Sequence, residues 1–186
     1  MNQQEAKSLL ASAQCIATME NIELAVAEMA VKINARLQDS NPIVLVIMTG
    51  GLIFSGHLLP KLNFPLEIDY LQANRYEKNL AGGDINWRVE PKLDVRQRCV
   101  LILDDILDEG ITLGAVSEKI YDLGASEVLS AVLINKQLSV TKVIQADFIG
   151  MDLPDLFLFG FGLDVFGYWR NLPDIYALSP IIAKDF

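Results

Sequence analysis

Three strongly apolar runs constrain the fold of this chain more than any other feature. "IVLVIM" (43–48), "CVLIL" (99–103) and "EVLSAVLI" (127–134) contain one charged residue between them and are rich in β-branched side chains. Strands that are apolar on both faces are typical of a parallel sheet covered by helices on each side. Helical spacing of apolar residues follows two of these runs, at 52–62 and 112–124. This alternation predicts an α/β protein with a mostly parallel central sheet.

Weaker patterns suggest the remaining elements. Residues 5–38 have apolar side chains at helical spacing and are expected to be helical. "PLEIDYLQA" (65–73) alternates apolar and polar residues, as a strand does, and "ADFIG" (146–150) reads as a further strand. The run "LFLFGFG" (156–162) is apolar with turn residues, and "DIYAL" (174–178) is expected to form an edge strand.

Length and composition indicate one globular domain. The chain has 186 residues, of which 52% are hydrophobic, so it can bury a core. The polar stretch 74–91 is too long for an ordinary connection and is expected to be a functional lid or an extended hairpin. Cys15 and Cys99 have no metal or redox spacing and are expected to be reduced, buried thiols.

Charge and targeting signals exclude some classes of protein. The formal net charge of −9 argues against a nucleic-acid binder, which usually carries a basic face. Charges or turn residues interrupt every apolar stretch before it could span a bilayer. The first residues lack a basic leader followed by an apolar run. We therefore expect a cytoplasmic protein with no membrane and no nucleic-acid partner.

The segment "VLILDDILDEGIT" (100–112) leads from an apolar strand into an acidic loop. Asp104, Asp105, Asp108 and Glu109 fall within six positions, just before a glycine and a helical pattern. In an open α/β sheet, ligands bind beyond the carboxyl ends of the strands. Carboxylates there suit hydroxyl groups, protons and Mg²⁺, whereas the N–H groups of the helix start suit phosphate. The alternative is an acidic surface loop with ordinary helix capping, because acids are favoured at helix starts.

The same segment resembles the phosphoribosyl-diphosphate-binding motif of type I phosphoribosyltransferases. Further segments match that family in an order that is similar to its hypoxanthine-guanine branch. These are "VIMTGG" (46–51) as diphosphate loop, "DYLQANRY" (69–76) as lid start, "LINK" (133–136) as purine-reading segment, "DFIGMDLPDLFLFGFGLD" (147–164) as base-stacking and metal segment, and "YWRNLP" (168–173) as arginine segment.

The resemblance implies a type I phosphoribosyltransferase fold spanning residues 1–186 as a single domain. It would have a core over about 40–150, a lid over about 74–91, and a small hood built from the N-terminal and C-terminal segments. The implied reaction transfers the 5-phosphoribosyl group from phosphoribosyl diphosphate to N9 of hypoxanthine or guanine, with Mg²⁺ as cofactor. The products are IMP or GMP and diphosphate, and the family usually forms homodimers or homotetramers.

The resemblance also assigns roles within the acidic loop. Asp104 and Asp105 would bind the ribose hydroxyls and contribute to the metal site, and Asp108 would be the catalytic base at purine N7. Desolvation makes a carboxylate a stronger base, so this role requires a closed site. The 5′-phosphate would be cradled by Glu109, Gly110, Ile111 and Thr112. The family prefers a hydroxyl residue at Glu109, so its carboxylate is expected to turn away from the phosphate.

A second set of residues would bind the diphosphate. Thr49 stands where many relatives have a basic residue, so backbone N–H groups of Thr49 and Gly50 would supply the contact. Arg170 would bind diphosphate oxygens; a surface ion pair is the alternative for an isolated arginine. Arg75 and Tyr76 match a Ser-Tyr pair at the base of the lid, and Arg75 could provide the cation that Thr49 lacks.

The purine site would involve four further residues. Lys136 only donates hydrogen bonds, so it suits the O6 acceptor of hypoxanthine or guanine rather than the amino group of adenine. Phe157 would stack on the base, Leu158 would offer backbone groups to its edge, and Asp164 would lie near the base and bind Mg²⁺. Taken singly, Lys136 could be a solvated lysine and Phe157 a core residue.

Two alternatives stay open from the sequence. Xanthine also carries O6, so Lys136 does not separate a xanthine-preferring enzyme from the hypoxanthine-guanine type. A non-catalytic regulatory protein could use the same fold, although such proteins need a basic surface. His57, the one histidine, is expected to be structural or on the surface.

Overall fold

A six-stranded sheet forms the centre of the protein, in a computed structural model that describes residues 1–75 and 85–178. The side chains of residues 74, 75 and 85 lie outside the description as well. The strand order is β4-β3-β2-β5-β6-β7, and every pairing is parallel except that of β3 with β4. The strands are β2 (Ile43–Ile47), β3 (Glu67–Arg75), β4 (Ile85–Val89), β5 (Cys99–Leu107), β6 (Glu127–Gln137) and β7 (Phe148–Pro154). The predicted α/β class is confirmed.

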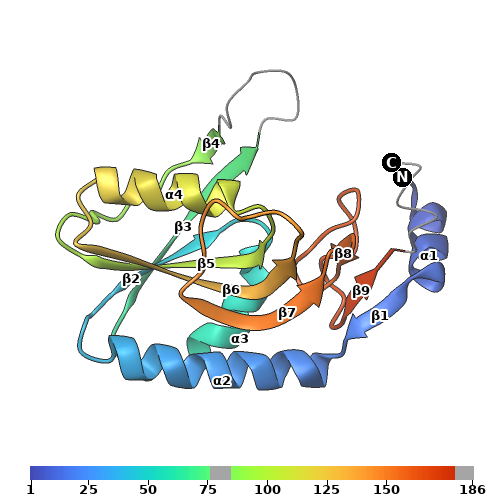
Figure 1. The fold of residues 1–186 in the computed structure, drawn as a ribbon, viewed down its shortest axis with the longest axis horizontal. Helices are drawn as coiled ribbons and strands as arrows, with labels where there is room; N and C mark the ends of the chain where they lie inside the picture. Colours follow the sequence, from blue (N-terminus) through green and yellow to red (C-terminus); the bar gives the residue numbers. More distant parts are fainter. Residues whose placement is uncertain (76–84, 179–186) are drawn as a thin grey trace.

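Helices cover both faces of this sheet (Figure 1). On one face, α2 (Met19–Leu37) and α3 (Gly51–Leu58) bury side chains such as Met29 and Phe54 against Val44 and Leu101. On the other face, α4 (Ile111–Asp122) packs on the alternate residues of the same strands, which include Leu45 and Ile102. Because both alternating sets are buried, the strands had to be apolar throughout.

A second, smaller sheet joins the two ends of the chain (Figure 1). Its antiparallel strands are β1 (Gln14–Ala17), β9 (Ile175–Ala177) and β8 (Leu158–Phe159), in the order β1-β9-β8. The first helix, α1 (Gln3–Ser12), packs Leu9 into a separate apolar cluster with Phe159 and Leu178. The Nε1–H of Trp169 also donates to the carbonyl oxygen of Ala6 at 2.8 Å.

Two sequence-based predictions about the N-terminal region are wrong. Residues 5–38 are not helical throughout, because the unpredicted strand β1 lies between the helices α1 and α2 and pairs with β9. Helix α2 begins instead at a capping box between Thr18 and Asn21, a start signal that interrupts the apolar periodicity. The thiol of Cys15 is exposed rather than buried, whereas Cys99 is buried as expected.

Other elements differ in extent or position. The strand predicted at 174–178 is the central strand of the small sheet and not an edge strand. Helix α3 gives way to a short 3-10 turn, η1 (Leu59–Lys61), that contains Pro60, which lacks the N–H needed to continue an α-helix. Strand β4 pairs antiparallel with β3, as expected if residues 74–91 form an extended hairpin. Residues 76–84 lie outside the description.

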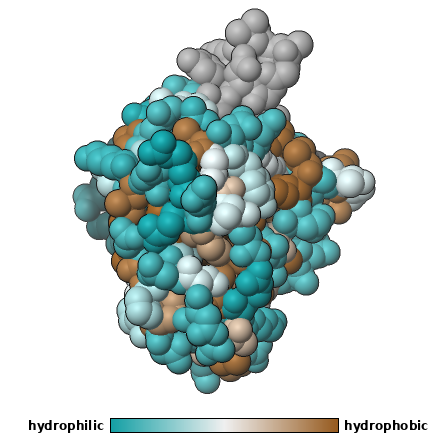
Figure 2. Space-filling view, turned by 90° about the vertical axis from the view of Figure 1, so that its left-hand side faces the viewer, coloured by the Kyte–Doolittle hydropathy of each residue, from teal (hydrophilic) through white to brown (hydrophobic). Residues whose placement is uncertain are grey.

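The described surface carries little continuous apolar area at the end of the molecule where α4 stops. That end is covered mostly by hydrophilic side chains (Figure 2). Arginines here pair with acids, at 2.8 Å between Arg98 and Glu67 and at 2.6 Å between Arg96 and Asp94. Within residues 1–75 and 85–178, no helix has the length and apolar character that crossing a bilayer demands.

Candidate active site

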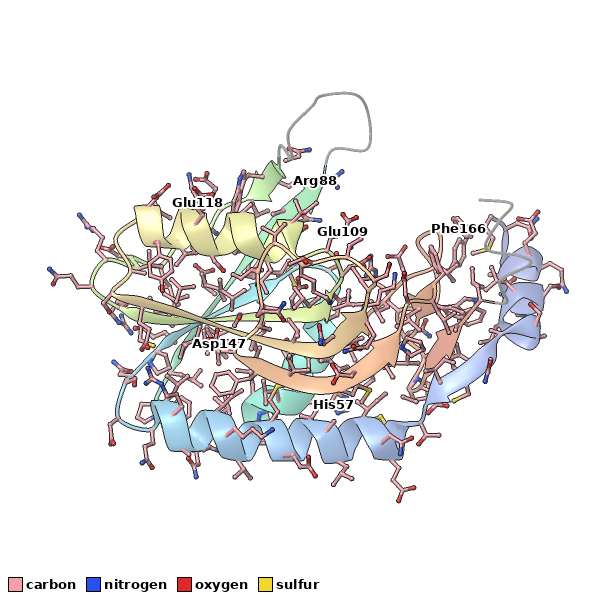
Figure 3. The ribbon with its side chains drawn as sticks, viewed as in Figure 1. His57, Arg88, Glu109, Glu118, Asp147 and Phe166 are labelled. Carbon is pink, nitrogen blue, oxygen red and sulfur yellow. The ribbon has the colours of Figure 1, made fainter. Side chains whose placement is uncertain are left out.

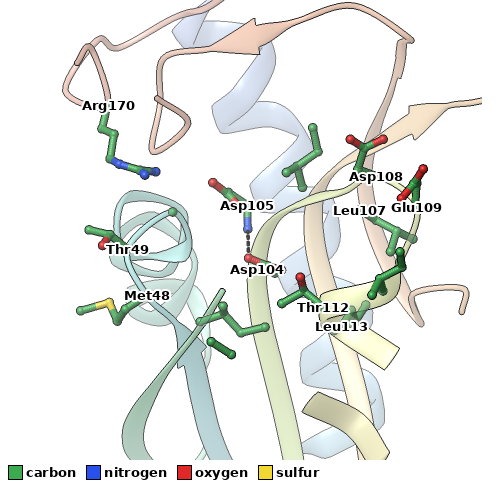
Figure 4. A pocket seen from close by; sticks show the side chains of 16 residues that line it. Met48, Thr49, Asp104, Asp105, Leu107, Asp108, Glu109, Thr112, Leu113 and Arg170 are labelled. Carbon is green, nitrogen blue, oxygen red and sulfur yellow. Dashed lines mark hydrogen bonds between the residues drawn. The ribbon is translucent and has the colours of Figure 1, made fainter. Parts of the chain in front are cut away.

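A cavity of about 330 Å³ opens at the carboxyl ends of β2 and β5 (Figure 4). Strand β3 lies next to one edge of β2, and β5 lies next to the other edge of β2. The strand order therefore reverses at β2. Such a switch point is where open α/β sheets bind ligands. The predicted residues that line it are Thr49, Gly50, Asp104, Asp105, Asp108, Glu109, Gly110, Ile111, Thr112 and Arg170.

Two adjacent carboxyl groups lie buried on the β5 side of the cavity. Asp104 and Asp105 are each only 8% exposed, and the N–H of Asp105 donates to Oδ1 of Asp104 at 3.0 Å. Burial raises the pKa of Asp104 well above its usual range, and the neighbouring Asp105 charge acts in the same direction. Burial also raises the pKa of Asp105, although Asp104 and the Arg170 charge oppose this. A bound cation or hydroxyl would relieve this unfavourable burial.

The loop after β2 approaches these carboxyl groups closely. The peptide bond between Met48 and Thr49 is cis. A Cβ atom on Gly50 would lie 1.9 Å from Oδ2 of Asp105, so only glycine fits at this position. On its other side, the Gly50 carbonyl oxygen would lie 2.4 Å from a Cβ atom on Gly162, which has a φ of +102°. Two glycines therefore let three segments meet at one point.

The start of α4 provides the opposite character on the other side of the cavity. Gly110 is the N-cap residue in the left-handed region, with a φ of +84°, and it contributes no capping side chain. The N–H groups of the first turn therefore remain directed toward the cavity, as suits an anion. In Figure 4 the Thr112 side chain lies in the cavity, while the Glu109 carboxylate points away from it, in line with the expectation for Glu109.

The expected base and the expected purine-reading lysine lie together. Nζ of Lys136 is 3.5 Å from Oδ2 of Asp108 and 3.0 Å from Oδ1 of Asp155. The Lys136 side chain is 15% exposed and the Asp108 side chain 53% exposed, so the acid faces the open side of the pair. The sequence did not predict the contact of Lys136 with Asp155. The one signal for Asp155 was its position two residues before Phe157.

Arg170 and Asp164 form the third charged pair. Nη2 of Arg170 is 2.5 Å from Oδ1 of Asp164, and Nη1 donates to the Gly162 carbonyl oxygen at 2.6 Å. The other Asp164 oxygen accepts from the N–H of Gly167 at 2.7 Å. The segment bearing Asp164 is thereby tied to the residue expected to bind diphosphate.

The remaining purine-site predictions lie outside the cavity lining. Lys136 and Asp164 form ion pairs with Asp108 and Arg170, respectively, and these two partners line the cavity. Leu158 is buried in β8, whereas the Phe157 ring is 44% exposed and stacks on Phe166 with a centroid distance of 6.2 Å. An exposed aromatic ring is available to a ligand.

Two predicted residues and the histidine fall elsewhere. Tyr76 and the side chain of Arg75 lie outside the described residues. His57 is on α3, below the sheet and away from Glu109 (Figure 3). Its Nδ1 contacts Glu23, and its ring lies 4.9 Å from that of Phe161, which fits the structural role expected for it.

The donor set suits Mg²⁺ bound together with a substrate. Within the described ranges, no three His, Cys, Asp or Glu side chains gather closely enough to hold a metal alone. Mg²⁺ commonly takes one or two carboxylates and completes its shell with water and substrate phosphate oxygens. The buried carboxyl groups of Asp104 and Asp105 and the carboxylate of Asp164 are oxygen donors of this kind.

The cavity brings together carboxyl groups at one strand end, a helix start and a glycine loop, a combination that suits a phosphorylated sugar. Comparison with known families agrees, because residues 12–165 match the phosphoribosyl transferase domain family. The chain belongs to the phosphoribosyltransferase family, with the type I fold and small hood that its sequence predicts.

Similar proteins narrow the resemblance to one branch. A hypoxanthine-guanine phosphoribosyltransferase of Bacillus subtilis is 30% identical over 167 residues, which cover 89% of this chain and 93% of the relative. One from Aquifex aeolicus is 31% identical, over 86% of this chain and 91% of the relative. A solved hypoxanthine phosphoribosyltransferase from Staphylococcus aureus superposes with a TM-score of 0.86 at 25% identity, covering 98% of both chains.

Proposed function

We propose that this protein transfers the 5-phosphoribosyl group of phosphoribosyl diphosphate to N9 of hypoxanthine or guanine, giving IMP or GMP and diphosphate in purine salvage. The observation that carries this proposal is the proximity of Lys136 to Asp108 beside the phosphate cradle. The names of the relatives from B. subtilis and A. aeolicus support the same choice of base.

The sugar phosphate would lie across the cavity between β5 and α4. The first-turn N–H groups after Gly110, with the Thr112 hydroxyl, would donate to the 5′-phosphate, where the helix dipole favours negative charge. Asp104 and Asp105 would accept hydrogen bonds from the ribose hydroxyls. Their negative charge would also stabilise the positive charge that develops on the sugar as diphosphate departs.

The purine would bind where Lys136 and Asp108 meet. An ammonium group donates to O6, and a carboxylate accepts the proton from N7, which lies on the same edge of the base. The 3.5 Å separation of Lys136 Nζ and Asp108 Oδ2 suits two groups that contact O6 and N7 on one edge of the same purine. Adenine would present an amino group to Lys136 and would be disfavoured.

Mg²⁺ is part of the proposal. When bound, it would neutralise diphosphate charge and orient the leaving group, held by Asp164 and by Asp104 or Asp105. Arg170 would exchange its ion pair with Asp164 for contacts with diphosphate oxygens. The backbone N–H groups of Thr49 and Gly50 would complete that subsite.

An assay of product formation tests this function. Purified protein with Mg²⁺ and phosphoribosyl diphosphate should form IMP from hypoxanthine and GMP from guanine, with little product from adenine. Xanthine belongs in the same assay, because a Tritrichomonas foetus relative, 26% identical, is named hypoxanthine-guanine-xanthine phosphoribosyltransferase. Failure with both hypoxanthine and guanine would contradict the proposal, and a clear preference for xanthine would replace it with the xanthine alternative.

We also propose that the protein works as a homodimer or homotetramer. Ile68 and Tyr70 lie on the same face of β3 and are 56% and 42% exposed in the single chain. Exposed apolar residues of this kind are typical of a surface that a second subunit covers. Light scattering should give twice or four times the chain mass of 20.6 kDa. A monomeric mass at assay concentration would contradict this.

A further inference from the structure

Lys142, in the connection between β6 and β7, is a charged side chain to which the reaction described so far assigns no role. Its Nζ donates to the carbonyl oxygen of Leu107 at 2.5 Å and to Oδ1 of Asn135 at 2.8 Å. Leu107 directly precedes Asp108, and Asn135 directly precedes Lys136. One ammonium group therefore links the backbone before the expected base to the side chain before the purine-reading lysine.

The residues after Lys142 continue this contact along the acidic loop. The N–H of Val143 donates to the carbonyl oxygen of Glu109 at 2.9 Å. Ile144 then packs against Gly110, where a Cβ atom would lie 3.2 Å from it. Both neighbours of Asp108 in the chain are thus held by consecutive residues of one connection, so the backbone at Asp108 has little freedom to move.

Asn135 extends the link to the end of β7. Its Nδ2 donates to Oδ1 of Asp152 at 2.7 Å, while its Oδ1 accepts from Lys142. An amide can donate on one side and accept on the other, which a carboxylate cannot do. Burial lowers the pKa of Lys142, and the charges of Asp108 and Asp152 act in the opposite direction without cancelling this effect.

We propose that Lys142 is a positioning residue that holds Asp108 and Lys136 at the separation needed to contact N7 and O6 of one purine. This inference rests on the proposed function for its catalytic consequence. Reacting groups must be held within a fraction of an ångström, because a displacement of about 1 Å can cost roughly 100-fold in rate. The Lys142 link is the fixed element between the two groups that contact the base.

The first test replaces the ammonium group and keeps the aliphatic stem. Lys142→Met should lower kcat by about 10- to 100-fold. The KM for phosphoribosyl diphosphate should stay within about twofold, because Val143 and Ile144 still contact Glu109 and Gly110 when the ammonium group is removed. The matched control is Lys32→Met, at an exposed position on α2, which should retain wild-type kinetics. A Lys142→Met enzyme with wild-type kcat would overturn the inference.

A double-mutant cycle separates positioning from general damage. In an Asp108→Asn background the base is already absent, so adding Lys142→Met should lower kcat by less than about twofold. The same 10- to 100-fold loss in both backgrounds would show that Lys142 acts independently of Asp108 and would overturn the inference. Lys142→Arg keeps charged donors and should recover part of the loss; recovery no better than with Met would also contradict it.

Hydrogen exchange tests the link without relying on activity. Peptides covering residues 107–113 should exchange faster in Lys142→Met than in wild type or Lys32→Met, and peptides of α2 should not change. Unchanged exchange at 107–113 would overturn the inference even for an enzyme with another substrate. Should Lys142→Met fail to fold, Lys142→Gln, which keeps a donor, carries the same measurements. Absence of transfer by wild type would contradict the proposed function alone.

Discussion

At the scale of single residues, the site buries carboxyl groups whose negative charge destabilises the ligand-free protein. Asp104 and Asp105 are adjacent, buried and on the same strand end, and the positive charge of Arg170 acts on Asp105. Ionised carboxyl groups in such a place reduce stability. This is typical of functional residues, whose charge is useful only when substrate and metal are bound.

Asp104→Asn should therefore stabilise the ligand-free protein at neutral pH. The pKa of Asp104 is raised by burial in the folded state, so the folded protein holds its proton more tightly than the unfolded chain does. The folded protein therefore loses stability as the pH rises from about 3.9, the pKa of an aspartic acid in the unfolded chain, toward the higher pKa of Asp104 in the folded state. The variant should gain about 1 kcal/mol or more in urea unfolding at pH 7 and almost nothing at pH 4. An equal gain at both pH values would contradict this.

Gly50→Ala should damage the diphosphate loop. The added methyl group would overlap the Asp105 carboxylate and force the loop or the acid to move. We expect a loss of about 1–3 kcal/mol in the free energy of unfolding and a higher KM for phosphoribosyl diphosphate. Gly56→Ala is a suitable control, because nothing lies within 4 Å of the added atom. Wild-type stability and KM in Gly50→Ala would show that the close contact is not needed.

Where candidate site residues follow one another in the chain, the sequence correctly predicted that they lie together. Residues 104–112 form a continuous motif, and the cavity brings all of the ones named in it together except for the Glu109 carboxylate, which points away as expected. Asp155 and Lys142 escaped prediction because their roles depend on contacts between separate connections. Cys15 was misjudged because its neighbours in space belong to β9, far away in the sequence.

At the scale of elements, the start of α4 provides the phosphate site. Its N-cap residue, Gly110, has no side chain, and no side-chain hydrogen bond caps the helix. The Thr112 hydroxyl is therefore not used for capping. That hydroxyl lies in the cavity, where it can donate to a ligand (Figure 4).

Thr112→Val should weaken binding of phosphoribosyl diphosphate without disturbing the helix. Valine has the same shape but lacks the donor, and one hydrogen bond to a charged group contributes about 1.5–3 kcal/mol. We expect KM for phosphoribosyl diphosphate to rise at least tenfold in steady-state kinetics, with the thermal midpoint nearly unchanged. An unchanged KM would remove Thr112 from the phosphate site.

Strands with strong patterns were the elements best predicted from the sequence. The runs at 43–48, 99–103 and 127–134 all became central strands because both of their faces are covered. The strand β1 between α1 and α2 was missed because the apolar spacing continues across it. Four residues that pair with the other end of the chain carry no local signal for that pairing.

At the scale of the whole molecule, the sheet and the hood meet at the site. The sheet supplies the acidic loop and the α4 start, and the segment after β8 supplies Gly162, Asp164 and Arg170. The parallel sheet could be predicted from the sequence, and the hood only from the family resemblance. Antiparallel pairing of both chain ends depends on contacts across more than 150 residues, as between Gln14 and Ala177.

The most direct test of the account is the rate of IMP formation by wild type and by Asp108→Asn, measured with saturating hypoxanthine, phosphoribosyl diphosphate and Mg²⁺. Asp122→Asn, an exposed acid at the end of α4, is the matched control. Wild type and the control should both form IMP, with kcat about 100- to 10,000-fold lower in Asp108→Asn because the base is lost. Wild type that forms no IMP or GMP, or an Asp108→Asn enzyme as fast as wild type, would contradict it.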